Sequence, residues 1–242
     1  MSELHTNRID AEPSFSLAES VVVFTGGDLM VGYDILLPVP RFVIAADSGL
    51  LQAVAFGCNV DLVVGDMDSV PPESLEDAKR SGAIVDRHPA AKDSTDFELA
   101  LDAAIDRKPK RIVIVGGNGG RIDHFFAGVL ALTRDELRGI EVTAHVGKAR
   151  LHVVRDSIVV EGQPGTLVTL LAIRGEVGGI RTTGLLYPLR DESLFPGSTR
   201  GVSNEMIGAS ATISVDHGTL LVLVPGEIGS HVLELFETET EN

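Results

Sequence analysis

The sequence has few of the features that mark secreted, membrane or nucleic-acid-binding proteins. Cys58 is the only cysteine, so neither an intrachain disulfide nor a cysteine-rich zinc site is possible. No apolar run approaches the ~18 residues that a membrane-spanning helix needs. Lys and Arg total 20 against 35 Asp and Glu, giving a net charge of −15, whereas phosphate backbones are bound by clustered basic residues. We therefore expect no membrane and no nucleic-acid partner.

The first twenty residues also lack a basic region followed by an apolar stretch, so no signal peptide is expected and a cytoplasmic location is predicted. We expect residues 1–20 to form a loose leader. The whole sequence is 44% hydrophobic and 23% charged. Its 242 residues are enough for one large or two modest domains with a real core. Most of the acidic charge is explained by a solvated surface.

Residues 21–156 have the pattern of an α/β domain. Continuous apolar runs alternate with helical patterns, which indicates a parallel sheet covered on both faces in a Rossmann-like, three-layer arrangement. Ligands of such sheets bind beyond the carboxyl ends of the strands. The expected strands are 21–25, 42–46, 62–64, 83–86, 111–115 and 141–146. The expected helices are 28–37, 49–56, 72–81, 94–107 and 123–137.

Residues 157–242 have a different pattern. Short runs rich in Val, Thr and Leu are separated by turns that contain Gly and Pro, which predicts a small antiparallel β domain, a sandwich or barrel, of which we expect the sandwich. The expected strands are 166–173, 211–215, 220–224 and 232–236.

Acidic residues gather where strands of the first domain are expected to end. In an extended segment Asp66 and Asp68 project to the same side, where their carboxylates can share a hard cation such as Mg²⁺. The structural alternative is that Asp68 and Ser69 cap a helix that begins at Pro71-Pro72. Carboxylates gathered at one sheet edge repel one another unless a cation lies between them, so a magnesium–phosphate site is the first hypothesis.

A further acidic segment, Lys92-Asp93-Ser94-Thr95-Asp96, precedes a predicted helix. Thr95 fits a capping box with Glu98, and acidic residues in a first helical turn are favoured by the helix dipole. The segment is nevertheless denser in charge than a cap requires.

A glycine-rich turn, residues 116–124, follows a predicted strand and opens a predicted helix. Glycines let backbone N–H groups approach phosphate oxygens, and a helix amino terminus favours negative charge. The turn matches neither the dinucleotide fingerprint nor the Walker A pattern, so an ordinary strand–helix connection is the alternative. Arg121 adds a fork of donors suited to phosphate, and His124 is either a phosphate donor or an ordinary surface residue.

Taken together and in order, these motifs resemble the thiamine pyrophosphokinase family. Asp47-Ser48-Gly49 is similar to its Asp-Gly-Gly segment. Residues 65–69 are similar to its Gly-Asp-x-Asp-Ser segment, and residues 92–96 to its Lys/Gln-Asp-x-Thr-Asp segment. The glycine turn is similar to its Gly-Gly-x-x-Gly-Arg-x-Asp-His segment. In the β domain, residues 165–170, 183–189 and 201–205 are similar to the family's first strand, its Gly-Leu-x-Trp-Pro-Leu segment and its Thr-Ser-Asn-Glu segment. The resemblance extends from about residue 21 to 225.

The resemblance implies a homodimeric enzyme with its active sites at the interface, which converts ATP and thiamine to AMP and thiamine diphosphate with Mg²⁺. It implies a catalytic ATP- and Mg-binding domain (21–156) and a thiamine-binding domain (157–242). The implied metal ligands are Asp47, Asp66, Asp68 and Asp96. The implied nucleotide-binding residues are Asp47, Lys92, Gly119, Arg121 and His124. The implied catalytic residues are Asp66, Asp68, Asp96, Arg121 and Asp123. The implied thiamine-binding residues are Tyr187, Ser203 and Asn204.

Two positions depart from the family pattern. Ser48 stands where many members have glycine, and Tyr187 stands where many have a tryptophan that stacks on thiamine. Tyrosine offers a smaller face to a cationic ring. Two alternatives therefore remain: a pyrophosphokinase or Mg-dependent phosphohydrolase for another hydroxymethyl heterocycle, such as a pterin, and a non-catalytic thiamine or nucleotide sensor.

Overall fold

The computed structural model describes residues 19–226 except 31, 34, 36 and 120, and the chain divides into two compact units. The first comprises residues 1–147 and 151–153, and the second comprises 148–150 and 154–242, so strand β7 (Ala149–Val154) contains the boundary. Most of the predicted leader, the predicted strand 232–236 and Gly120 of the glycine turn lie outside the described residues.

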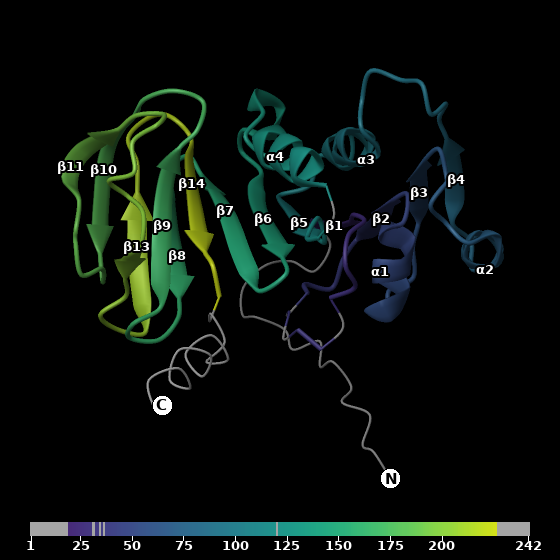
Figure 1. The fold of residues 1–242 in the computed structure, drawn as a ribbon, viewed down its shortest axis with the longest axis horizontal. Coiled ribbons are helices and arrows are strands. Elements are labelled where there is room, and N and C mark those ends of the chain that lie inside the picture. The colour runs from purple at the N-terminus through teal and green to yellow at the C-terminus, as the bar shows by residue number, and fades with distance from the viewer. Residues whose placement is uncertain (1–18, 31, 34, 36, 120, 227–242) are drawn as a thin grey trace, which may run out of the picture. The chain divides into compact units, whose positions relative to one another are not determined.

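The first unit contains the predicted parallel sheet, with the order β6-β5-β1-β2-β3-β4 and parallel pairing throughout these six strands (Figure 1). The central strand β1 is buried along its whole length because it is almost entirely apolar and covered on both faces. The strands are β1 (Ser20–Phe24), β2 (Phe42–Ala46), β3 (Leu62–Gly65), β4 (Ile84–Arg87), β5 (Arg111–Val115) and β6 (Glu141–Val146).

The crossover helices follow from this strand order. The chain moves outward from β1 to β4 and then returns to β5 on the other side of β1. Right-handed crossovers therefore place α1 and α2 on one face and α3 and α4 on the other. Leu50 and Ala53 of α1 and Leu75 of α2 share one apolar cluster with alternate residues of the sheet. The helices are α1 (Gly49–Ala55), α2 (Pro72–Arg80), α3 (Asp96–Ile105) and α4 (Ile122–Ala131), with a 3-10 turn at Asp135–Leu137.

The predicted helix 28–37 is wrong: the described residues of this stretch form a loop. Gly32 has a φ of 86°, which a right-handed helix cannot accommodate. The Met30 N–H and the Asp28 carbonyl are hydrogen-bonded to the side chain of Gln52 rather than to other backbone groups of a helix. Tertiary hydrogen bonds thus replace the helical ones at this segment.

Two loops meet at the carboxyl ends of β1 and β5, where successive connections leave the sheet in opposite directions. The Gly117 N–H donates to the Gly26 carbonyl at 2.7 Å, and the Asp28 N–H donates to the Asn118 carbonyl at 2.9 Å. Gly27 has a φ of 127°, and a Cβ there would overlap the Asn118 carbonyl. This is the switch point at which parallel α/β sheets bind ligands.

The second unit confirms the predicted antiparallel β-sandwich. Four strands pair in the order β11-β10-β13-β8, and β9 pairs with β12 on one side and β14 on the other. Buried residues of both sets form one core cluster, which includes Val160, Leu170 and Ile213. The strands are β8 (Ser157–Glu161), β9 (Leu167–Ala172), β10 (Val177–Thr183), β11 (Arg190–Leu194), β12 (Asn204–Glu205), β13 (Ser210–Ser214) and β14 (Leu220–Val224). Among the described residues, every helix is too short or too polar to span a membrane.

Candidate active site

A cavity of about 660 Å³ lies at the carboxyl edge of the sheet in the first unit. Its walls come from the loops after β1, β2, β3, β4 and β5, from the first turn of α3 and from α4. All of the residues predicted for metal and nucleotide binding line it together, whereas Asp123, predicted as a catalytic residue, is not among the described lining residues. The predicted residues in the lining are Asp47, Asp66, Asp68, Lys92, Asp96, Gly119, Arg121 and His124.

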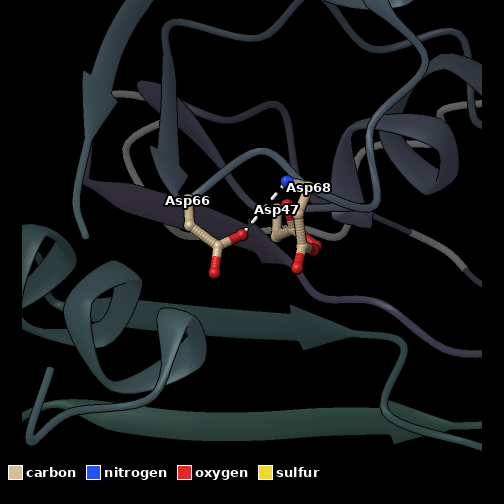
Figure 2. Close-up of side chains that lie close together, drawn as sticks. All are labelled: Asp47, Asp66 and Asp68. Carbon is tan, nitrogen blue, oxygen red and sulfur yellow. Dashed lines mark hydrogen bonds between the residues drawn. The ribbon is translucent and has the colours of Figure 1, made fainter. Parts of the chain in front are cut away.

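Three carboxylates converge on one wall of this cavity (Figure 2). Asp47, Asp66 and Asp68 each offer one oxygen atom, and these three atoms lie within 4.8 Å of one another. The Asp68 N–H donates to Asp66 Oδ1 at 3.0 Å. Between them Met67 has a φ of 65° and a buried side chain, so this left-handed turn anchors in the core while both flanking carboxylates face the cavity.

Asp47 is the most constrained of the three. It also has a left-handed backbone, with a φ of 46°, and its Oδ1 is buried without a hydrogen-bond partner among the described residues. Burial raises the pKa of the Asp47 carboxyl above its usual value, and the negative charges of Asp96 and Asp66 raise it further. A hydrogen bond from the Ser48 backbone lowers this pKa and so opposes the effect.

Gly65 allows the acidic segments that contain Asp47 and Asp96 to approach each other closely. Its φ is 145°, and a Cβ at this position would lie 2.9 Å from Asp96 Oδ1 and 3.2 Å from Asp47 Cβ. Any side chain here would push the acidic segments apart. Lys92 then supplies positive charge, because its Nζ lies 2.9 Å from Asp96 Oδ1 and 4.0 Å from Asp66 Oδ2. The pair with Asp96 is ionic rather than a directed hydrogen bond.

The two capping interpretations of the acidic segments have different outcomes. Helix α2 has Pro71 as its N-cap and, in the part of the chain that is described, no side-chain cap, so Asp68 and Ser69 do not serve that purpose. At α3 the Thr95 hydroxyl accepts the Glu98 N–H at 3.1 Å, which confirms the cap there. Asp96 is thus both a first-turn residue and part of the cavity wall.

The carboxylate group fits a hard divalent cation. Its donors are oxygens, they converge within one coordination sphere, and the buried Asp47 Oδ1 lacks a partner among the described groups. Closely spaced like charges in such an arrangement are costly unless a cation compensates them. Asp47, Asp66 and Asp68 are therefore suited to hold Mg²⁺.

The glycine turn brings a cation to the same cavity. Arg121 precedes α4 and forms a forked ion pair with Asp123, with 3.2 Å between Nε and Oδ1 and 2.6 Å between Nη2 and Oδ2. The hydrogen bond from Arg121 lowers the pKa of the Asp123 carboxyl to about 2. Both side chains are exposed, and His124 lies beside them at the start of the helix. Asp123 thus acts on the cavity through Arg121.

The residues predicted to bind thiamine lie in the second unit. The Tyr187 ring is 66% exposed, whereas Asn204 is buried. The Asn204 side chain accepts the Tyr187 N–H at 3.0 Å and donates to the Tyr187 carbonyl at 2.7 Å. Ser203 has a φ of 56° and donates its N–H to the Thr169 hydroxyl. In this unit, Asn204 fixes the backbone that presents the exposed tyrosine.

Several cavity residues were not anticipated from the sequence. The loop after β1, including Gly26, Gly27 and Asp28, lines the cavity beside the glycine turn, as do Ser69 and Phe97. The signal was available in part: a Gly-Gly pair follows an apolar run after one threonine, much as a Gly-Gly pair follows the apolar run before residues 116 and 117. No local pattern marks Phe97, which faces the cavity from the first turn of an amphipathic helix.

Comparisons with known proteins agree across both units. Residues 34–144 match the family model for the thiamin pyrophosphokinase catalytic domain, and residues 155–220 match the model for the thiamin pyrophosphokinase vitamin B1 binding domain. The chain is 27% identical over 182 residues to a thiamine pyrophosphokinase of Bacillus subtilis, covering 73% of this chain and 80% of the relative.

Solved structures give the same result. A thiamin pyrophosphokinase from Geobacillus thermodenitrificans is 28% identical with a TM-score of 0.68, covering 87% of this chain and 99% of the other. A thiamin pyrophosphokinase family protein from Enterococcus faecalis is 25% identical with a TM-score of 0.71, covering 85% and 97%.

Proposed function

The chain belongs to the thiamine pyrophosphokinase family, and we propose that it transfers the pyrophosphoryl group of ATP to the hydroxyl of thiamine, giving thiamine diphosphate and AMP. The observation that carries the proposal is the convergence of Asp47, Asp66 and Asp68 on the wall of a cavity that also holds Arg121. Such a wall would repel a polyphosphate by itself. A shared cation reverses that repulsion.

Mg²⁺ would be held by Asp47, Asp66 and Asp68, with Asp96 beside them. When bound, the cation supplies charge neutralisation and orientation for the transferred phosphoryl oxygens. Ser69 supports this arrangement, because its hydroxyl donates to Asp68 Oδ1 at 2.8 Å. Lys92 balances part of the negative charge on Asp66 and Asp96 and offers the polyphosphate a point charge.

The remaining groups position and stabilise the reacting oxygens. The thiamine hydroxyl oxygen forms a bond to the β-phosphorus of ATP. The bond from that phosphorus to the oxygen that bridges it to the α-phosphorus breaks, so AMP departs with this oxygen. The hydroxyl proton passes to one of the carboxylates. Arg121, Lys92 and the backbone N–H groups of the glycine turn stabilise the charge that develops on the phosphoryl oxygens. His124 donates to a phosphate oxygen at the start of α4.

Thiamine is bound by the second unit through Tyr187 and Ser203, with Asn204 holding the tyrosine backbone. The exposed ring of Tyr187 provides a face for stacking on a cationic aromatic ligand. The net charge of −15 favours the approach of cationic thiamine.

We include a homodimer in the proposal, with active sites completed across the interface, and the cytoplasmic location that the composition predicts. The homodimer is supported by α4, where Ile122, Phe126 and Leu130 are 66%, 60% and 53% exposed on one helical face. Apolar groups spaced in this way mark interaction surfaces.

The test is AMP formation from Mg-ATP with and without thiamine, with products separated by chromatography. Thiamine-dependent AMP together with thiamine diphosphate is the expected result. Turnover with a pterin alcohol but not with thiamine would favour the other pyrophosphokinase, which neither family model nor relatives support. Binding of ATP and thiamine without AMP release would instead identify a sensor.

A further inference from the structure

Gln52 is a buried polar residue on α1 whose side chain serves another part of the chain. It is 1% exposed. Its Oε1 accepts the Met30 N–H at 3.0 Å, and its Nε2 donates to the Asp28 carbonyl at 2.6 Å. One amide thus satisfies a donor and an acceptor on the backbone of the loop that follows β1. Gln52 itself lies behind this loop and is not among the described residues that line the cavity.

The loop that Gln52 holds forms a wall of the proposed nucleotide site. Gly26, Gly27 and Asp28 line the cavity. The Asp28 N–H donates to the Asn118 carbonyl of the glycine turn at 2.9 Å, so the loop lies between the Gln52 side chain and that turn. Movement of the loop would therefore move the glycine turn, which also lines the cavity.

Helix α1 also joins this loop to the metal ligands. Asp47 lies two residues before the helix, and its carbonyl accepts the Leu50 N–H at 3.1 Å. A single helix thus fixes a carboxylate at its start and the opposite loop through Gln52. The segment 28–30 is not helical, and the Gln52 amide bonds the Met30 N–H and the Asp28 carbonyl in place of helical partners.

We propose that Gln52 is a positioning residue for Mg-ATP binding, acting through the 26–30 loop and the glycine turn, and this rests on the function proposed above. The amide performs this role because it donates and accepts at once. Glutamate keeps the acceptor for Met30 but loses the donor to Asp28, and methionine loses both.

The experiment compares Gln52→Met, Gln52→Glu and the control Ala53→Gly. Ala53 is fully buried on the same helix and has no polar side-chain group, so its replacement by glycine lowers the Tm without removing a hydrogen bond to the loop. Hydrogen exchange at the Met30 amide reports directly, in the nucleotide-free protein, whether its hydrogen bond to Gln52 is intact. Steady-state kinetics give the KM for Mg-ATP, the KM for thiamine and kcat.

We expect Gln52→Met, which removes both hydrogen bonds to the loop, to lose exchange protection at Met30 and to raise the KM for Mg-ATP about tenfold. The KM for thiamine stays unchanged in Gln52→Met. Gln52→Glu has intermediate exchange protection at Met30 and an intermediate KM for Mg-ATP. Ala53→Gly lowers the Tm and leaves both KM values unchanged. An unchanged KM for Mg-ATP in Gln52→Met, or an equal rise in Ala53→Gly, overturns the inference. Wild-type protein that fails to bind Mg-ATP would contradict the proposed function itself.

Discussion

Lys92 and Asp96 form an ion pair at the cavity wall, with 2.9 Å between Nζ and Oδ1. The same ammonium lies 4.0 Å from Asp66, and its side chain is only 14% exposed, so solvent screens it poorly. Lys92 is thus the local countercharge of a carboxylate cluster. It must favour a polyphosphate and disfavour a bare divalent cation.

Replacing Lys92 by methionine should separate these two effects. We expect tighter binding of Mg²⁺ to the nucleotide-free protein, because a repelling charge is gone. The KM for Mg-ATP should rise about tenfold, because one charge-assisted contact is lost. Calorimetry with Mg²⁺ and steady-state kinetics measure the two changes. Lys110→Met is the control, since Lys110 forms an exposed pair with Glu19. Weaker Mg²⁺ binding in Lys92→Met would contradict this role.

The carboxylate cluster gives the second prediction. Asp68→Asn should lower kcat more than about 100-fold, because a bound metal supplies several kcal/mol of transition-state stabilisation. The Tm without Mg²⁺ should be maintained or raised, since one of three adjacent like charges is removed. Asp93→Asn is the matched control, from an exposed aspartate of the next acidic segment. Near-wild-type turnover by Asp68→Asn would exclude a metal ligand at this position.

Asp123 gives a prediction about pH. Its folded-state pKa of about 2 is below the ordinary value of 3.8, so its stabilising pair with Arg121 is fully present above pH 3.8 and is lost as the pH falls toward 2. In the wild type the Arg121 guanidinium donates to two carboxylate oxygens of Asp123, and Asp123→Asn leaves only one acceptor oxygen. We expect kcat to fall about tenfold through a misplaced Arg121, with the shape of the pH profile unchanged between about pH 5 and pH 9.

The control for this prediction is Asp77→Asn, which breaks an exposed carboxylate–arginine pair with Arg80 on α2. That variant should keep full activity. A shift of the acid limb of the profile in Asp123→Asn would mean that Asp123 titrates in the working range, contrary to its pairing.

The fold of the first unit could be predicted because its signal is local. Continuous apolar runs such as β1 and β5 can be buried only in a covered parallel sheet, and topology then brings the segments after their ends to one edge. The segment after β1 could not be predicted in this way. Its helical pattern is overridden by Gln52, a partner more than twenty residues away, and by Gly32.

The second unit was less predictable for a related reason. Strand β11 has the sequence Arg190-Asp191-Glu192-Ser193-Leu194, which has no strand-like composition, and it forms because it pairs with β10. Asn204 was expected to contact thiamine from a motif alone, whereas in the structure its amide is bonded to the backbone of Tyr187. Sequence motifs identify residues that matter more readily than the partner each one has.

The exposed tyrosine gives the fourth prediction. Tyr187→Trp should preserve or lower the KM for thiamine, because a larger aromatic face stacks better on a cationic ring. Tyr187→Ala should raise it about tenfold, with the KM for Mg-ATP unchanged. Steady-state kinetics with each substrate varied in turn provide the test. A large loss of thiamine affinity in Tyr187→Trp would show that this ring does not stack on the substrate.

Asn204 should act on thiamine through that tyrosine. In Asn204→Asp the two acceptor bonds from the Tyr187 and Glu205 N–H groups survive, but the donor to the Tyr187 carbonyl is replaced by an oxygen. Two buried acceptors then face each other, which costs about 1–3 kcal/mol. We expect a lower Tm and a higher KM for thiamine, with the KM for Mg-ATP unchanged. Gln163→Glu, the same change at an exposed turn of this unit, is the control. If Asn204→Asp lowers the Tm while the KM for thiamine stays at the wild-type value, Asn204 supports the sandwich alone and does not position Tyr187 for the substrate.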